Sequence, residues 1–495
     1  MRVYSHDFCG HTFHKTSSLH PFYTSAFASP LFPTMSQPPP RDISVTIFGA
    51  TGFTGQYIVE EVYRTLSSTT FYPNPPAIPA NLSWAIAGRS HEKLQELLDR
   101  VEARYNAEKM LPRPEILIAD ITKRDTLDAM CKRTHVVINA VGPFRFMGEY
   151  VVRACVENGA NYVDITGEPE FIERMQRTYH DEAKKKGVII VHACGFDSVP
   201  SDMAVLWNKQ QIESRDHATP VQMEMYFTIK IGPHGMVGHY ATFESAVYGF
   251  SSTSTLQSLR EYSNLPKLPK VPGPKLVLYK SPRWNQRIKA YTLPFVFADP
   301  SIVRLSQQLF LAGQAAVPDQ GNAVMPPTVQ FTAYFVFPRL WPLILMVCYG
   351  WMFSFLAATP WGRNMLLRNP ERYTAGLFSR TGPTRQQIET TRFETTFITR
   401  GFSTEALRAV MAPPDDGAAP LVQKPDVEMV TRVEGPEAGY DATPRIVVQC
   451  AYALIEEKGK GRVPNGVVTP SVAFWRTGLI KRLTDVGISF EVLEG

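Results

Sequence analysis

The chain has 495 residues, enough for two or more domains with substantial hydrophobic cores. Its formal net charge of +5 is modest, and without a dense Lys/Arg block the sequence argues against a nucleic-acid partner. The six cysteines are scattered without a Cys-x-x-Cys pair or a Cys/His cluster, which argues against a metal site of the zinc type and against a disulfide framework.

Residues 1–35 differ in composition from the rest of the chain. They are rich in Ser, Thr, His and aromatic residues, carry few charges and contain no continuous apolar run of the kind a secretory signal peptide needs. A mitochondrial presequence is the alternative, although Arg2, Asp7 and Lys15 make a poor basic amphipathic helix. We expect a disordered N-terminal extension over 1–35.

A glycine-rich loop follows the first predicted strand. The apolar, β-branched run 43–48 predicts a buried strand, and helix-period apolar residues resume after residue 55. Gly49 would allow a tight turn, Gly52 would let the backbone approach a pyrophosphate, and Gly55 would let helix and strand pack closely. The new helix would offer free N–H groups to the phosphates. A glycine-rich turn without a ligand is the alternative. The loop residues expected to contact a dinucleotide are Gly49, Thr51, Gly52, Phe53, Thr54 and Gly55.

The end of the second predicted strand, 82–87, indicates which dinucleotide is bound. An acidic residue at this position would bind the ribose hydroxyls of NAD. The sequence instead has Arg89 with Ser90 beside it, which suits a 2′-phosphate, so NADP is preferred over NAD. Alternatively, Arg89 only begins the next helix.

Two further strand ends complete the predicted cofactor site. The third strand ends at Asp120, which either faces the adenine or caps a helix from Thr122. The fourth strand, 136–138, is followed by small residues that would allow close approach of a cofactor. These residues are Asn139, Ala140, Val141 and Gly142.

The alternation of strands and helices predicts a Rossmann domain over residues 36–198, an α/β domain with a doubly wound parallel sheet. From about Asp202 the pattern changes, so residues 199–495 are assigned to a second domain. In it, 221–229 alternates as a half-exposed antiparallel strand does, and 331–337 is a further strand.

Nine motifs of the sequence belong together: Gly49–Gly55, Ala87–Arg89, Asn139–Phe144, Tyr162–Glu168, Gly195–Asp202, Ser245–Phe250, Gly382–Thr384, Gly435–Tyr440 and Ala442–Pro444. Together they resemble the saccharopine dehydrogenase-like oxidoreductase family, which is also similar to trans-acting enoyl reductases. The resemblance covers the chain from about Ile43 onward. It implies a Rossmann domain followed by an α+β domain of saccharopine-reductase type, with association to membranes or lipid droplets. The family supplies no catalytic residue set.

The second domain contains a long uncharged segment, 340–359, with Trp341, Tyr349 and Trp351. Its length is about that needed to cross a hydrocarbon core of roughly 30 Å. Arg339 precedes it, and three arginines follow it: Arg363, Arg368 and Arg372. This arrangement favours contact with a membrane or droplet. A span, a hairpin that enters one leaflet and a buried core helix all remain open.

Four titratable residues are predicted between the cofactor and the second domain: Glu168, His192, Asp197 and Asp202. His192 is the most plausible proton donor by residue type, with Asp197 as a second candidate, while structural roles are the alternative for both. Asp202 is expected to cap a helix.

The sequence therefore predicts an NADP-dependent oxidoreductase acting on a small-molecule or lipid-related substrate at a membrane, lipid droplet or cytosolic face of the endoplasmic reticulum. The mitochondrion is the second choice of location, and a homodimer is left open. A non-catalytic nucleotide-binding membrane protein is the alternative. A saccharopine dehydrogenase of lysine metabolism is less favoured, because such an enzyme has no use for the segment 340–359.

Overall fold

A computed structural model describes residues 41–494 apart from 68–70, 73, 106–110, 318–323 and 413–422. The extension predicted over residues 1–35 lies outside the described residues. The described chain falls within one compact unit, Pro39–Gly495, which contains two seven-stranded sheets.

The first sheet is parallel throughout and has the order β15-β6-β5-β4-β1-β2-β3. Its strands are β1 (Ile43–Phe48), β2 (Trp84–Gly88), β3 (Glu115–Ile118), β4 (Thr134–Asn139), β5 (Asn161–Asp164), β6 (Ile189–Val191) and β15 (Gly466–Val468). Five helices alternate with them: α1 (Phe53–Leu66), α2 (His91–Tyr105), α3 (Arg124–Arg133), α4 (Phe144–Asn158) and α5 (Pro169–Lys185). The predicted doubly wound parallel sheet is confirmed.

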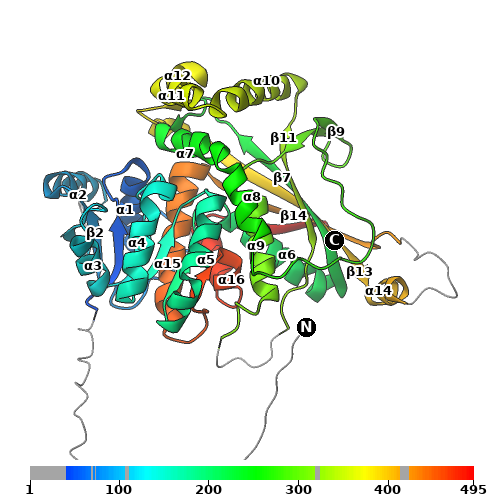
Figure 1. Cartoon of the computed structure of the whole chain (residues 1–495), viewed down its shortest axis with the longest axis horizontal. Helices are drawn as coiled ribbons and strands as arrows, with labels where there is room; N and C mark the ends of the chain where they lie inside the picture. Colours follow the sequence, from blue (N-terminus) through cyan, green and yellow to red (C-terminus); the bar gives the residue numbers. More distant parts are fainter. Residues whose placement is uncertain are drawn as a thin grey trace, which may run out of the picture. The chain divides into compact units, whose positions relative to one another are not determined.

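The seventh strand of this sheet comes from the C-terminal part of the chain. β15 pairs with β6, and α15 (Thr443–Lys458) packs against α1, β4 and β5. Residues beyond the predicted boundary at 198 therefore complete the first domain. Figure 1 shows α15 among the helices of the first sheet.

The second sheet has the order β16-β14-β13-β7-β11-β10-β9. Its strands are β7 (Ala218–Lys230), β9 (Arg283–Asn285), β10 (Ala290–Pro294), β11 (Gln330–Phe337), β13 (Arg392–Ser403), β14 (Val427–Pro436) and β16 (Ser489–Glu494), while β8 (Gly238–His239) and β12 (Phe378–Ser379) form a separate pair. The other helices are α6 (Val199–Asp216), α7 (Tyr240–Ser251), α8 (Thr253–Glu261), α9 (Asp299–Leu311), α10 (Leu340–Ala357), α11 (Pro360–Arg368), α12 (Pro370–Tyr373), α13 (Arg385–Thr390), α14 (Thr404–Met411), η2 (Ala438–Ala442), α16 (Pro470–Phe474) and α17 (Leu479–Asp485).

The strand predicted over 221–229 is confirmed, and so is an antiparallel neighbour, but the expectation that it is half-exposed is wrong. β7 is the central strand of the second sheet, antiparallel to β13 but parallel to β11. Met223 and Phe227 belong to the main core, whereas Tyr226 is buried in a separate cluster on the other face. A central strand covered on both faces does not need a polar side, so the alternation in its sequence is misleading.

Candidate functional site

The glycine-rich loop has the geometry expected of a phosphate-binding turn. Gly49 adopts φ +86°, and a Cβ there would lie 2.7 Å from Cγ2 of Val141. A Cβ at Gly55 would lie 2.1 Å from the carbonyl oxygen of Gly49, so helix α1 approaches strand β1 more closely than a side chain would allow. Gly52 is exposed, and the first turn of α1 closes with a bond from Gln56 N–H to the Gly52 carbonyl. The N–H of Gly52 donates to the Gly49 carbonyl, so the N–H groups of Phe53, Thr54 and Gly55 are the ones available to an anion.

The predicted cofactor residues are brought to one edge of the sheet. They follow β4, β1, β2 and β3, which are neighbours in the sheet order and whose parallel carboxyl ends meet there. Arg89 is exposed and makes no hydrogen bond or ion pair with another described residue, which leaves its guanidinium available to a phosphate. Ser90 Oγ accepts from the N–H of Lys93 and so stabilises the first turn of α2.

Asp120 does not cap a helix in the way its position predicts. Its Oδ1 accepts from both N–H and Oγ1 of Thr122, two residues on, whereas α3 begins only at Arg124. These bonds lower the pKa of Asp120, and the charge of Arg89 lowers it further. A local turn therefore takes the carboxylate before the helix starts.

Asn139 orders the end of β4 rather than presenting its side chain to a ligand. Its Oδ1 accepts from Val141 N–H at 3.0 Å and its Nδ2 donates to Oη of Tyr162 at 3.0 Å. Gly142 is exposed, and a Cβ there would make only ordinary contact with Phe144. This turn can accommodate close approach of a ligand.

Glu168 binds the residues that follow this turn. Its carboxylate accepts from the N–H groups of Phe144 and Arg145 at the start of α4, and from Oγ of Ser245 in α7. Burial raises the pKa of Glu168, while Arg145 lowers it. The side chain predicted as a titratable site residue thus joins α7 to the first domain.

The second domain also contacts the glycine-rich loop through Phe53. The Phe53 ring stacks on His239 with centroids 4.2 Å apart, and Tyr440 lies edge-on at 5.0 Å. Tyr440 Oη in turn accepts from the N–H of His239 at 2.7 Å. The side chain of Phe53 is therefore used in packing between domains, and its backbone N–H is the group left for a cofactor.

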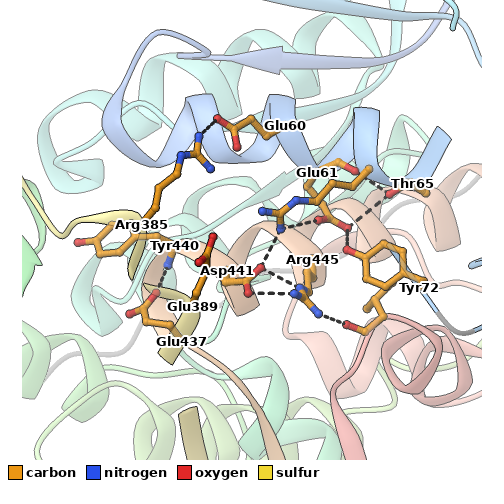
Figure 2. A network of polar contacts seen from close by, with 12 residues as sticks. Glu60, Glu61, Thr65, Tyr72, Arg385, Glu389, Glu437, Tyr440, Asp441 and Arg445 are labelled. Atoms are coloured by element: carbon orange, nitrogen blue, oxygen red, sulfur yellow. Dashed lines mark hydrogen bonds and ion pairs between the residues drawn. The ribbon is translucent and has the colours of Figure 1, made fainter. Parts of the chain in front are cut away.

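A buried polar network joins the middle of α1 to the C-terminal region. Arg64 and Arg445 both bind Asp441 at 2.9 Å, and Arg385 binds Glu60 at 2.5 Å. Figure 2 shows these ion pairs, which come from α1, α13, η2 and α15. The helix that opens the phosphate site is held from its side by the second half of the chain.

His192 is occupied by a structural contact. Its Nδ1 lies 2.7 Å from Oδ2 of Asp164, which also accepts from Oη of Tyr162, and the imidazole is fully buried. Phe171 lies edge-on to the ring at 5.2 Å. A substrate would have to displace this packing to reach His192, so the geometry favours the structural role.

Asp197 and Asp202 differ sharply in their surroundings. Asp202 is buried inside α6, where its Oδ2 accepts from Oγ of Ser306 and from the N–H of Ser471. It therefore caps α16 rather than its own helix. Asp197 is partly exposed and makes no hydrogen bond with another described residue, and burial raises its pKa to about 6. Among the residues that the structure describes, no cluster of His, Cys, Asp or Glu could hold a metal ion.

The apolar segment forms α10, which is long and apolar enough to cross a membrane. It is mostly exposed: Trp341, Trp351 and Phe355 are 62%, 79% and 76% exposed. Only its two ends are covered, where Leu343 near the start and Leu356 and Ala357 at the end are buried. The alternative of a buried core helix therefore does not hold, because the rest of the protein covers α10 only at its ends.

The ends of α10 are both tied to the folded body. Its residues contact β10 and β11 as well as α7 and α11, and Figure 1 shows it lying alongside α11 and α12. Arg363 donates to the carbonyl of Ala357 and so caps α10. A Cβ at Gly362 would lie 2.1 Å from the carbonyl of Leu356, so α11 begins tightly against α10.

Comparison with known proteins places this architecture in a family. The model of the saccharopine dehydrogenase NADP binding domain matches residues 45–191, which hold the glycine-rich loop and the first six strands. A saccharopine dehydrogenase-like oxidoreductase from Homo sapiens is 37% identical over 453 residues, covering 92% of this chain and 98% of the relative. The chain belongs to the saccharopine dehydrogenase-like oxidoreductase family. It is thus an oxidoreductase with an NADP-binding domain, as the sequence predicts.

Two other relatives of this oxidoreductase family differ in the locations their names give. A protein from Arabidopsis thaliana named as a mitochondrial saccharopine dehydrogenase-like oxidoreductase is 34% identical, covering 93% of this chain and 98% of the relative. A lipid droplet localized protein from Caenorhabditis elegans is 31% identical, covering 90% of this chain and 97% of the relative. The names of these two relatives thus include both of the predicted locations, the mitochondrion and the lipid droplet.

Sequence reasoning missed the residues of the second domain that approach the cofactor loop. His239, Thr443 and Ser245 contact residues of the first domain across large sequence separations. Ser245 and Thr443 carried a signal only as parts of the motifs Ser245–Phe250 and Ala442–Pro444 of the family resemblance, whereas His239 lies in none of these motifs. Contacts of this kind depend on the tertiary fold.

Proposed function

We propose that this chain is an NADP-dependent oxidoreductase that acts on a lipid-related substrate at the surface of a membrane or lipid droplet. The observation that carries the proposal is the exposed apolar helix α10, which α7 connects to the cofactor edge of the first sheet. The proposal has a cofactor part and a surface part, which separate experiments can test.

The residues at the sheet edge fit NADP. Gly49, Gly52 and the opening of α1 would hold the pyrophosphate, since the backbone is unobstructed and its first N–H groups are available. Arg89 would pair with the 2′-phosphate, with Ser90 beside it, and the Asn139–Gly142 turn would lie against the nicotinamide side. Bound NADPH supplies hydride, and these residues bind and orient it.

Helix α7 supports the link between cofactor and surface. On one side, its Ser245 donates to Glu168, and the carbonyl of Tyr248 accepts from Arg145 of α4. On its other side, Phe243 and Val247 are buried against the end of α10. A substrate held at the surface of α10 would therefore lie one helix away from the cofactor edge.

The attachment of both ends of α10 favours a helix lying in the interface over one that crosses the bilayer. Each large apolar side chain gains roughly 1.5–3 kcal/mol when fully buried, and α10 exposes several of them. Arg339, Arg368 and Arg372 flank it without a partner among the described residues, so they can contact anionic headgroups.

Two other functions fit the observations less well. A non-catalytic nucleotide-binding protein would need the same cofactor site, and only a turnover assay separates it from an enzyme. A saccharopine dehydrogenase of lysine metabolism would have no use for an exposed apolar helix. We place the protein at a lipid droplet or the cytosolic face of the endoplasmic reticulum, with the mitochondrion second.

The surface part is tested by flotation of purified protein with phospholipid vesicles and with artificial droplets. A variant in which Trp341, Trp351 and Phe355 are replaced by Ser should stay in the dense fraction, whereas wild type floats. Replacing Tyr262, which is 75% exposed elsewhere, is the matched control and should float. Point variants are preferable to deletion of 340–359, since deletion would uncover Phe243 of α7. Equal flotation of wild type and the triple variant would contradict the proposal.

A further inference from the structure

Asp197 occupies a position from which a proton could reach a substrate. It lies between β6 and α6, at the same carboxyl edge of the parallel sheet as the cofactor residues. A Cβ at Gly167, in the loop after β5, would lie 2.7 Å from Oδ2 of Asp197. The carboxyl group therefore fits against bare backbone, is partly exposed, and has no hydrogen bond to another described residue.

A second carboxyl group is bonded to the first turn of α6, directly after Asp197. Asp299, at the start of α9, is 5% exposed. Its Oδ1 accepts from Oγ of Ser201, while its Oδ2 is buried without a partner among the described residues. The hydroxyl of Ser198, next to Asp197, is likewise fully buried and unpartnered. Unsatisfied buried polar atoms are rare, and here two of them belong to residues at the start of α6 or bonded to it.

The charges around this pair oppose ionisation of both carboxyl groups. The charge of Asp197 acts on Asp299 more strongly than that of Asp202, and burial together with these charges raises the pKa of Asp299 to about 7. The nearby cation is Lys209 of α6, which acts on Asp202 rather than on Asp299. Because ionisation of one carboxyl group disfavours ionisation of the other, the two groups together keep a proton near neutral pH.

We propose that Asp197 donates the proton that accompanies hydride transfer, and that Asp299 is a positioning residue that keeps Asp197 supplied with that proton. This rests on the proposed function. The O–H bond of Asp197 would break as its proton passes to the substrate, while an electrophilic carbon of the substrate receives two electrons as hydride from bound NADPH. The Asp197 carboxylate would then recover a proton from Asp299.

The backbone at this position is consistent with a functional role. Ser198 has φ +112°, in the left-handed region that a serine rarely adopts. Strain of this kind persists where the surrounding structure fixes a functional geometry. His192, the other candidate donor, is instead fully buried and bound to Asp164.

The experiment uses the full-length protein and the variants Asp197→Asn and Asp299→Asn. Asp125→Asn, an exposed carboxyl group in the first turn of α3, is the matched control. Infrared spectroscopy follows the carbonyl stretch of protonated carboxyl groups from about pH 5 to pH 8. We expect wild type and Asp125→Asn to keep this band until the upper part of the pH range. The band of Asp197→Asn should be weaker from the start, and that of Asp299→Asn should disappear at lower pH than in wild type. An Asp299→Asn titration that matches wild type would overturn the proposal.

Two further measurements separate this inference from the proposed function. NADPH fluorescence titration should give the same affinity for wild type and Asp197→Asn, whereas failure of wild type to bind would refute the proposed function alone. With NADPH and a lipid extract, Asp197→Asn should turn over roughly 10²–10⁴-fold more slowly, the range for loss of a general acid. Turnover equal to wild type would overturn the role of Asp197 while leaving the cofactor assignment intact.

Discussion

Replacing Asp441 by Asn should loosen α1 and thereby the phosphate site. Asp441 binds Arg64 and Arg445 through three contacts of 2.9 Å, and all three side chains are largely buried. Removing one partner of a buried ion pair costs about 3–5 kcal/mol, because the remaining charge is left uncompensated. At 1.4 kcal/mol per factor of ten, a loss of about 3 kcal/mol lowers protection against local opening roughly 100-fold.

Hydrogen exchange followed by mass spectrometry measures this loss directly. Peptides from α1 and α15 should exchange roughly 100-fold faster in Asp441→Asn, whereas peptides from α9 serve as an internal control. The protection lost on the Asp441→Asn substitution should be smaller at high pH. Burial raises the pKa of Glu61 to about 7, and above that pH its carboxylate gives Arg64, 3.7 Å away, a second anion. Unchanged exchange in α1 and α15 would refute the assignment of a stabilising role to this network.

Three further predictions follow from the same structure. Arg89→Asp should weaken NADPH binding far more than NADH binding in a fluorescence titration, because a repelling anion replaces the cation; equal weakening would exclude a contact with the 2′-phosphate. Gly55→Ala should fail to give folded protein in circular dichroism, since its Cβ would lie 2.1 Å from the Gly49 carbonyl, whereas Gly249→Ala, with nothing within 4 Å, should fold; a folded Gly55→Ala would contradict the close helix contact. Glu61→Gln should flatten the pH dependence of stability. Burial raises the pKa of Glu61 to about 7 in the folded protein, so the free energy of unfolding of wild type falls by on the order of 3 kcal/mol as the pH rises from the ordinary pKa of a glutamate through about 7. A Glu61→Gln variant whose urea unfolding depends on pH as wild type does would contradict this.

The first domain was predictable because its signals are local. A buried strand, three glycines and a helix fall within one short stretch, and their roles depend on backbone geometry that glycine alone permits at Gly49. Strand β15 could not be predicted in the same way. It has three residues, Gly466–Val468, and joins the sheet beside β6 only because the chain returns from the second domain.

The candidate site was predictable in part. Residues that follow strands β1, β2 and β4 meet at one edge because parallel topology requires it. The role of an acidic residue depends on what lies opposite it, which the sequence does not contain. Asp197 and Asp202 both lie near the start of α6. Asp202 nevertheless accepts from Ser471 across the fold, whereas the charge of Asp197 acts on Asp299 of α9.

For the apolar segment 340–359, the sequence predicted the helix but not its surroundings. Its sequence predicted a helix of membrane-spanning length, and α10 is such a helix. Whether the helix is buried, exposed or crossing a bilayer depends on its neighbours. The structure adds that Trp351 is exposed and that both ends of α10 contact the folded body, two facts that length and hydropathy do not contain and on which our proposal of an interfacial helix rests.

The most direct test of the account is transfer of deuterium from NADPH labelled at the nicotinamide C4 position to a lipid. Purified protein would be incubated with the labelled cofactor and a lipid extract, and the lipids examined by mass spectrometry. Gly52→Val, whose side chain would occupy the space the pyrophosphate needs, is the inactive control. The account predicts a deuterated lipid with wild type and none with Gly52→Val. Wild type that binds NADPH but labels no lipid would contradict it.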